Sequence, residues 1–281
     1  MISQLRNKFF QRLAASHIAG PSPASALEIS RRVAANEWGS TFCCWNGPDS
    51  GPPDLFRSYS ELLDALPDDG GTYDLSLKAP SFHYNLELVQ LISQRAALRK
   101  MGIEFDSHGT EAADPTHRVA EKVRIFHDNV VCAVPARWSR SIKDVDWAAE
   151  NQIGIRIVKG QWPDPANMGI DFLKNYIAIV ERAAARRVKT YVATHNPSIA
   201  RESLRILQGA GCPCALEVMF SLPLGVTKTA KTLGVPVRVY IPYGYPYLPY
   251  NLTHVHTRPA VALWAMRNFV FGRYPRQRPL Y

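Results

Sequence analysis

The sequence predicts a single-domain α/β protein, a (βα)8 or TIM-type barrel in which eight parallel strands alternate with helices. Three observations support this fold class. Short β-branched or apolar runs alternate with longer segments of helical periodicity. The loops between these segments are short, as in other α/β folds with a parallel sheet. Finally, the length of 281 residues suits one barrel of this kind, which typically needs roughly 250 residues.

The predicted strands share a core of β-branched or apolar residues. In chain order they span 40–45 (STFCCW), 73–78 (YDLSLK), 102–106 (GIEFD), 129–134 (NVVCAV), 153–158 (IGIRIV), 189–194 (KTYVAT), 214–219 (CALEVM) and 236–241 (PVRVYI). Amphipathic segments between them include 85–101, 114–127, 169–186 and 197–209. The last begins at Asn196-Pro197, where proline suits the first helical turn. An open, doubly wound sheet is the alternative, but no glycine-rich phosphate loop follows an early strand.

The domain is expected to span 1–281, with a helical lead-in at 1–38 and a C-terminal helical segment with a basic tail at 249–281. The first 27 residues contain no acid and include the amphipathic, basic stretch MISQLRNKFFQRLAA. A short helix that leads into the fold is the favoured interpretation of this stretch. A mitochondrial transit peptide is the alternative.

Composition limits the protein class. Hydrophobic residues make up 46% of the chain and charged residues 20%, which allows a large core and argues against disorder. No apolar run approaches the ~20 residues that a membrane span needs. The five cysteines are odd in number and form no CxxC pair, so a reducing, cytoplasmic location is expected.

The net charge of +9 is concentrated at the C-terminal end. No acidic residue follows Glu217, whereas eight basic residues do: Lys228, Lys231, Arg238, Arg258, Arg267, Arg273, Arg276 and Arg278. Such a face attracts an anionic group, either a phosphorylated cofactor or an acidic partner protein. Nucleic acid is not expected as the partner, because no nucleic-acid-binding motif accompanies these charges.

In a barrel of this kind, functional residues lie at the C-terminal ends of the strands. Charged and hydrogen-bonding residues recur at the predicted ends, while the strand interiors are expected to be apolar. Lys78 and Asp106 would face inward from neighbouring strands. Because a buried charge is costly unless it is paired, they form either part of a site or a structural ion pair.

Five motifs at predicted strand ends have a common likeness. They are IRIVKGQW (155–162), YVATHN (191–196), SLK (76–78), FD (105–106) and VRVYIPYGYPYLPY (237–250). Together and in this order, the chain resembles the proline dehydrogenase family, in particular its monofunctional bacterial type. The resemblance extends from about residue 12 to the C-terminus. It implies a distorted barrel and an FAD-dependent dehydrogenase or oxidase.

The resemblance also implies roles for particular residues. Arg156 would lie beside the flavin ring and favour its reduced, more negative state. The implied catalytic residues are Lys78, Asp106, Arg156 and Tyr240. The implied cofactor-binding residues are Arg156, Lys159, Gly160, Thr194, His195, Asn196, Glu217 and Met219. The implied substrate-binding residues are Lys78, Trp162, Tyr240, Tyr250, Thr253, His254 and Thr257. A core histidine with satisfied ring nitrogens is the alternative for His195.

The chain departs from the family pattern at several positions. Two glutamines of the family are replaced by Pro135 and Met219, a tyrosine by Trp162, and a lysine after the fifth strand has no counterpart in 163–171. Two family arginines that hold the carboxylate of proline are replaced by Thr253 and His254, and a glutamate that pairs with this arginine region is replaced by Thr257. Arg258 and Pro259 match the family again, so these replacements are not the result of a shifted alignment. We therefore expect an amine-type substrate, small or carrier-bound, other than free proline.

Two other functions remain open. The first is a non-catalytic flavin-binding or scaffold barrel that keeps the fold without turnover. The second is a metal-dependent hydrolase that uses His254 and His256, because an HxH pair occurs at zinc sites. This pair is expected on a helix, where side chains two residues apart point to different faces, so the hydrolase is the least favoured.

Overall fold

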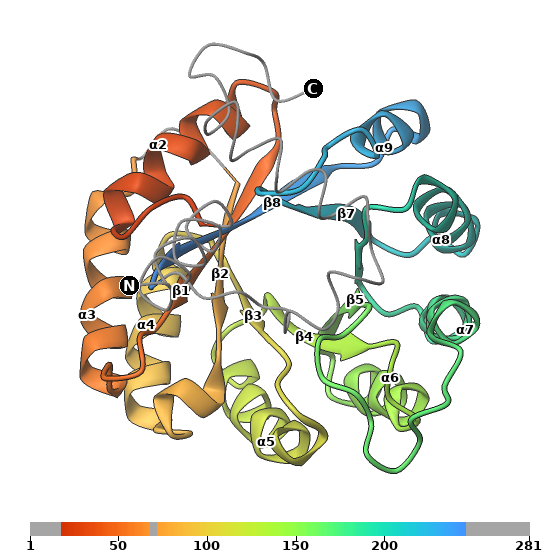
Figure 1. The fold of residues 1–281 in the computed structure, drawn as a ribbon, viewed down its shortest axis with the longest axis horizontal. Coiled ribbons are helices and arrows are strands. Elements are labelled where there is room, and N and C mark those ends of the chain that lie inside the picture. Colours follow the sequence, from red (N-terminus) through yellow and green to blue (C-terminus); the bar gives the residue numbers. More distant parts are fainter. Residues whose placement is uncertain (1–17, 68–71, 246–281) are drawn as a thin grey trace, which may run out of the picture.

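The computed structural model describes residues 18–67 and 72–245, and it contains a closed barrel of eight parallel strands in sequential order (Figure 1). The strands are β1 (Gly39–Trp45), β2 (Tyr73–Leu77), β3 (Gly102–Phe105), β4 (Val130–Pro135), β5 (Gly154–Val158), β6 (Thr190–Ala193), β7 (Cys214–Met219) and β8 (Val237–Gly244). The predicted (βα)8 fold is therefore confirmed. Each predicted strand corresponds to an observed one, and β8 runs three residues beyond its predicted end at 241.

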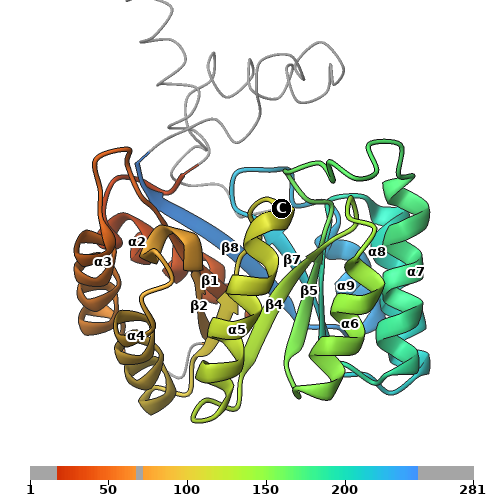
Figure 2. The ribbon, with the colours of Figure 1, turned by 90° about the horizontal axis from the view of Figure 1, so that it is seen from below.

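Helices surround the barrel and run alongside the strands (Figure 2). They are α2 (Pro23–Ala34), α3 (Pro52–Ala65), α4 (Leu86–Leu98), α5 (Ala113–Arg124), α6 (Ser141–Glu150), α7 (Phe172–Ala185), α8 (Pro197–Gly209) and α9 (Thr227–Leu233), with short 3-10 helices η1 (Ala79–Phe82) and η2 (Thr110–Ala112). The side chains of Asn85, Asp171 and Asn196 cap α4, α7 and α8 by accepting hydrogen bonds from first-turn amides. No helix among residues 18–67 and 72–245 is long and apolar enough to cross a membrane.

Alternation along the strands separates two environments. Ile103, Ile155 and Val239 belong to the apolar core that also contains the buried faces of the helices. The residue next to each of them, Glu104, Arg156 and Arg238 respectively, is buried but lies outside that core. Because successive side chains of a strand point to opposite faces, these charged residues face the inside of the barrel.

The expectation of apolar strand interiors is therefore wrong. Five charged residues in the middle of strands are buried inside the barrel: Asp74, Glu104, Arg156, Glu217 and Arg238. The physical reason is that barrel closure brings acids and bases from different strands into contact, so that each charge gains a partner.

The first and last strands close the barrel over seven residue pairs, from Gly39 opposite Arg238 to Trp45 opposite Gly244. The segment before α2 joins this seam, because the Ala19 amide donates to the Pro242 carbonyl at 2.7 Å. The Gly244 amide in turn donates to the carbonyl of Gly20 at 2.9 Å. Residues 19 and 20 therefore pair with the end of β8, next to its pairing with β1.

Candidate functional site

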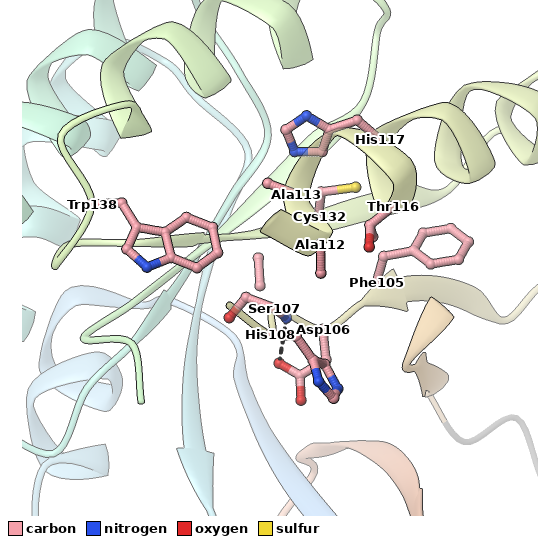
Figure 3. Close-up of a pocket in the computed structure, with 11 residues that line it drawn as sticks. Phe105, Asp106, Ser107, His108, Ala112, Ala113, Thr116, His117, Cys132 and Trp138 are labelled. Carbon is pink, nitrogen blue, oxygen red and sulfur yellow. Dashed lines mark hydrogen bonds between the residues drawn. The ribbon is translucent and has the colours of Figure 1, made fainter. Parts of the chain in front are cut away.

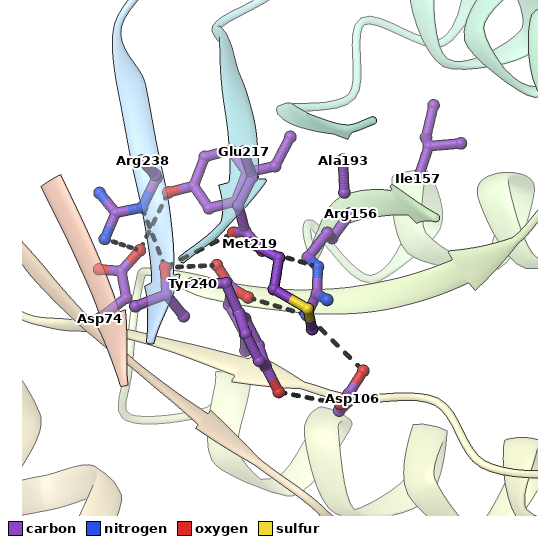
Figure 4. A network of polar contacts seen from close by, with 12 residues as sticks. Asp74, Asp106, Arg156, Ile157, Ala193, Glu217, Met219, Arg238 and Tyr240 are labelled. Carbon is purple, nitrogen blue, oxygen red and sulfur yellow. Dashed lines mark hydrogen bonds and ion pairs between the residues drawn. The ribbon is translucent and has the colours of Figure 1, made fainter. Parts of the chain in front are cut away.

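Arg156 lies at the centre of a cluster that connects the barrel interior to its C-terminal mouth (Figure 4). Its Nε is 3.0 Å from Glu217 Oε1, and its Nη1 is 3.3 Å from Glu104 Oε2 and 3.6 Å from Asp106 Oδ1. The ring of Tyr240 packs against the guanidinium, with 4.7 Å between its centroid and Cζ. Burial alone would lower the pKa of Arg156, but the three carboxyl groups raise it well above its ordinary value. Arg156 is therefore a fixed cation.

Glu104 and Glu217 flank Arg156 inside the barrel. The hydroxyl of Thr41 in β1 is 3.5 Å from a carboxyl oxygen of each. Burial and the neighbouring Glu217 raise the pKa of Glu104 well above its ordinary value, against the opposing effect of Arg156. Burial also raises the pKa of Glu217, opposed by Arg156 and Arg238.

A second ion pair lies deeper in the barrel. Arg238 Nη2 is 2.8 Å from Asp74 Oδ2, and the hydroxyl of Tyr191 donates to the same carboxylate oxygen at 3.2 Å. The other Asp74 oxygen accepts from the Gly102 amide at 2.7 Å. Sequence reasoning missed this pair and Glu104. The signal that could have found them is a lone charged residue in the apolar pattern of β2, β3 and β8.

The mouth of the barrel brings together the four residues for which a catalytic role was predicted. Tyr240 donates a hydrogen bond to Asp106, and Lys78 lies over the ring of Trp45, with 5.2 Å between its Nζ and the centroid. Burial would raise the pKa of Asp106, but Arg156 and Lys78 outweigh it and lower the pKa. Asp106 is therefore an anion at neutral pH, between two cations.

The loop after β5 carries three of the other predicted residues. Lys159 Nζ lies 4.2 Å from the ring centroid of Phe172. Gly160 has a φ of 87°, and a Cβ there would be 2.7 Å from Pro135 Cβ. Trp162 is 44% exposed and stacks on His108, with 6.3 Å between the ring centroids. The loops after β3 and β5 thus meet at the rim, and Gly160 allows its loop to pass close to β4.

The Thr194-His195-Asn196 segment uses its side chains within the fold. Thr194 Oγ1 accepts from the Asn196 amide at 3.1 Å, and Asn196 caps α8. The Met219 amide donates to His195 Nε2 at 3.0 Å, so Nδ1 carries the proton and donates to the Pro223 carbonyl at 3.0 Å. Burial lowers the pKa of His195, which keeps the ring neutral. His195 thereby fixes the loop after β7.

Comparisons with known proteins agree with this architecture. No family model matches the chain. The chain is 20% identical to Proline dehydrogenase 1 of Bacillus subtilis subsp. natto over 213 residues, which is 70% of each chain. It is also 20% identical to Proline dehydrogenase 2 of Bacillus subtilis (strain 168) over 206 residues, or 69% of this chain and 68% of the relative. The chain is proline dehydrogenase-like.

Solved structures share the fold of this proline dehydrogenase-like barrel. Proline utilization A (PutA) from Bdellovibrio bacteriovorus, inactivated by N-propargylglycine, superposes on 95% of the chain with a TM-score of 0.71 and 15% identity. A mutant PutA from Bradyrhizobium japonicum superposes on 91% with a TM-score of 0.66 and 16% identity. The chain covers 34% and 30% of the lengths of these two PutA chains.

A pocket beside the mouth of the proline dehydrogenase-like barrel was not predicted (Figure 3). Its lining comes from β3, β4, the start of α5 and the loops that follow these strands: Phe105, Asp106, Ser107, His108, Ala112, Ala113, Thr116, His117, Cys132, Ala133 and Trp138. Asp106 belongs to both the pocket and the Arg156 cluster. Among the residues that line the pocket, Asp106 is the one that was predicted from the sequence as a site residue.

Several predicted residues cannot be placed relative to the site. Tyr250, Thr253, His254 and Thr257 lie outside the described residues, as do His256 and the segment 249–281. Within residues 18–67 and 72–245, no group of three or more His, Cys, Asp or Glu side chains could hold a metal ion.

Proposed function

We propose that this chain is a flavin-dependent oxidoreductase that removes hydride from an amine-type substrate, at a C–N or N–N bond, and that this substrate is not free proline. The observation that carries the proposal is the convergence of Arg156, Asp106 and Tyr240 at the C-terminal mouth of the barrel. Similarity to two proline dehydrogenases over about 70% of the chain supports it.

The described residues fit FAD. Arg156 Nε is buried and makes no well-aligned hydrogen bond, although Glu217 lies 3.0 Å away, so the guanidinium keeps donor capacity. Gly160 lets the loop after β5 turn sharply at the mouth, beside the cation of Lys159. We expect Arg156, Lys159 and Gly160 to hold the cofactor, with backbone groups of the Thr194-His195-Asn196 segment.

When bound, FAD supplies the hydride acceptor. Arg156 provides a fixed positive charge that favours the negative charge developing on reduction. Tyr240 gives an aromatic wall, and its contact with Asp106 holds both side chains in place. Asp106, as an anion, balances Arg156 and Lys78 and offers an acceptor to an amine N–H. These groups orient a substrate and stabilise charge, which is what hydride transfer asks of a protein.

The proposed substrate class follows from residues 253, 254 and 257. An arginine pair would hold a carboxylate by charge-assisted hydrogen bonds of about 1.5–3 kcal/mol each. Thr253 offers one neutral hydroxyl, and a histidine such as His254 is ordinarily mostly neutral near pH 7. Loss of both arginines therefore weakens carboxylate binding by on the order of a hundredfold or more. An amide, ester, hydroxyl or carrier-bound group fits better.

The test is spectroscopic. The protein, reconstituted with FAD, should show flavin absorbance that bleaches with the correct amine when oxygen is excluded, but not with millimolar proline. The triple variant Thr253→Arg, His254→Arg, Thr257→Glu should gain bleaching by proline. Absence of flavin absorbance after reconstitution would reject the cofactor. Efficient bleaching of the unmodified protein by proline would reject the substrate class.

A non-catalytic flavin-binding or scaffold barrel is the second candidate. The observation that favours it is the internal use of the Thr194, His195 and Asn196 side chains, which have partners within the fold. This candidate predicts that no amine bleaches the flavin absorbance, whether or not the protein binds flavin. The same titration therefore separates the two functions.

A further inference from the structure

The carboxyl groups of Glu104 and Glu217 meet inside the barrel, beneath the mouth. The two residues are 1% and 2% exposed, and Thr41 Oγ1 lies 3.5 Å from Glu104 Oε1 and 3.5 Å from Glu217 Oε2. Both carboxyl groups also reach the guanidinium of Arg156. The Thr41 hydroxyl has one proton and can donate to only one of the two carboxyl groups at a time. Two ionised carboxylates around one guanidinium repel each other, so a proton on one of them is favoured.

The surrounding charges lead to the same conclusion. The groups around this pair and Arg156 are Thr41 from β1, Asp74 from β2, Asp106 after β3, Tyr191 from β6, and Arg238 and Tyr240 from β8. Lys189, which precedes β6, acts on Asp74 and Glu104, and Lys78, which follows β2, acts on Asp106. Arg156 contacts three carboxyl groups, those of Glu104, Asp106 and Glu217, whereas Arg238 pairs with Asp74. One proton on the glutamate pair reduces the number of negative charges in contact with Arg156 from three to two.

We propose that Glu104 and Glu217 share one proton at neutral pH, held mainly by Glu104, and that the pair positions Arg156 with a single negative charge. The effect of this pair on the reduction potential of a bound flavin rests on the proposed function. The directions of the two pKa shifts agree: both are raised by burial, and Glu104 is raised further by Glu217.

The pair explains how Arg156 can be both fixed and electrostatically effective. Glu217 Oε1 lies 3.0 Å from Arg156 Nε and carries the negative charge of the pair. The neutral Glu104 lies 3.3 Å from Nη1, where it orients the guanidinium without neutralising its positive charge. If both glutamates were ionised, Arg156 would face three carboxylates and would offer little positive potential at the mouth. Glu104 and Glu217 are thus positioning residues that act through Arg156.

The first test uses the protein without flavin. Infrared spectra at pH 7 of the wild-type chain, with and without ¹³C-labelled glutamate, should show the carbonyl stretch of a protonated carboxyl that shifts with the label. This measurement needs no variant. Glu104→Gln should lose the band, and the exposed control Glu150→Gln should keep it. A wild-type spectrum with no such glutamate band at neutral pH would overturn the proposal.

The second test uses the FAD-reconstituted protein. Glu104→Gln imitates a neutral carboxyl and should shift the flavin reduction potential less than Glu217→Gln, which removes the charge beside Arg156 and should raise the potential. Equal shifts in the two variants would contradict the assignment of the proton to Glu104. The two hypotheses can fail separately. A protonated glutamate in a protein that never binds FAD rejects the proposed function, and bound FAD without a protonated glutamate rejects the pair.

Discussion

The hydroxyl of Tyr240 donates a hydrogen bond to Asp106 Oδ2 at 3.1 Å, across the barrel mouth from β8 to the end of β3. The ring of the same tyrosine packs on the guanidinium of Arg156. One side chain therefore touches both the anion and the cation of the proposed site. It couples the position of each to the other.

Tyr240→Phe should separate these two contacts. The ring stays against Arg156, but the hydrogen bond that helps to lower the pKa of Asp106 is lost, so this pKa should rise. A hydrogen bond to a charged group contributes about 1.5–3 kcal/mol, and we expect a loss of unfolding free energy within that range at neutral pH. Carboxyl NMR titration and urea unfolding measure the two effects. The exposed Tyr245→Phe is the control, and an unchanged Asp106 titration in Tyr240→Phe would contradict the prediction.

Arg156→Met should affect both stability and cofactor. Removal of one partner of a buried ion pair typically costs about 3–5 kcal/mol, because the remaining charge is left uncompensated. We therefore expect a large loss of unfolding free energy, measured by urea unfolding, together with a lower flavin reduction potential in the reconstituted protein. The control is the double variant Arg156→Met, Glu217→Gln, which removes the charge that Arg156 compensates. If the double variant is no more stable than the single one, Glu217 is not the main partner.

Gly160→Ala should disturb the loop after β5. Its φ of 87° is strained for any L side chain, and the new Cβ would lie 2.7 Å from Pro135 Cβ. We expect a loss of about 1–3 kcal/mol in unfolding free energy and at least tenfold weaker FAD binding by fluorescence titration. The control is Gly225→Ala, since a Cβ at Gly225 meets no atom within 4 Å. Equal FAD affinity in the two variants would remove Gly160 from the cofactor site.

His117 should make the fold sensitive to acid. Its ring is buried and stacks on Trp147 with 3.8 Å between centroids, and burial, with help from Arg140, lowers its pKa to about 4. In the unfolded chain a histidine has a pKa of about 6.5, so the unfolded state binds the proton first. This contribution to stability is present above pH ~6.5 and is lost as the pH falls toward 4, by roughly 3 kcal/mol at most.

The measurement is urea unfolding at several pH values between 7 and 4. His117→Phe keeps an aromatic ring against Trp147 but cannot bind a proton, so its stability should fall less steeply over this interval. NMR titration of the imidazole gives the pKa directly. A normal pKa for His117, or identical slopes for the wild type and His117→Phe, would show that the ring is accessible to protons in the folded state.

The barrel could be predicted because its outer face follows a local pattern. Ile103 and Phe105, like Ile155 and Ile157, alternate as expected for strands that pack against helices. Asp106 could be proposed because it directly follows a predicted strand and function gathers at the C-terminal ends of barrel strands, whereas Arg156 and Tyr240 could be proposed from the family-like motifs of their own strands. Both inferences depend on one strand at a time.

The interior network could not be predicted in the same way, because it depends on which strands become neighbours after closure. Asp74 and Arg238 are far apart in the sequence and meet only across the barrel. In isolation, Glu104 or Arg238 is one charge in an apolar strand, which local reasoning treats as an exception. The role of His195 was left open for a similar reason, since its two partners, Met219 and Pro223, come from another strand end.

The order of interior charges along the chain has a consequence for how the barrel assembles. The first half, β1 to β4, contributes the acids Asp74, Glu104 and Asp106 with one base, Lys78, while Arg156 and Arg238 come from β5 and β8. In a half-barrel made of the first four strands, these acidic side chains would therefore repel one another. Asp74 would lack its partner Arg238 until β8 is in place. We expect the two halves to be poor folding units when expressed separately and to associate when mixed. The ion pairs inside the barrel thus also link an early strand, β2, to the last strand, β8, in one cooperative folding transition.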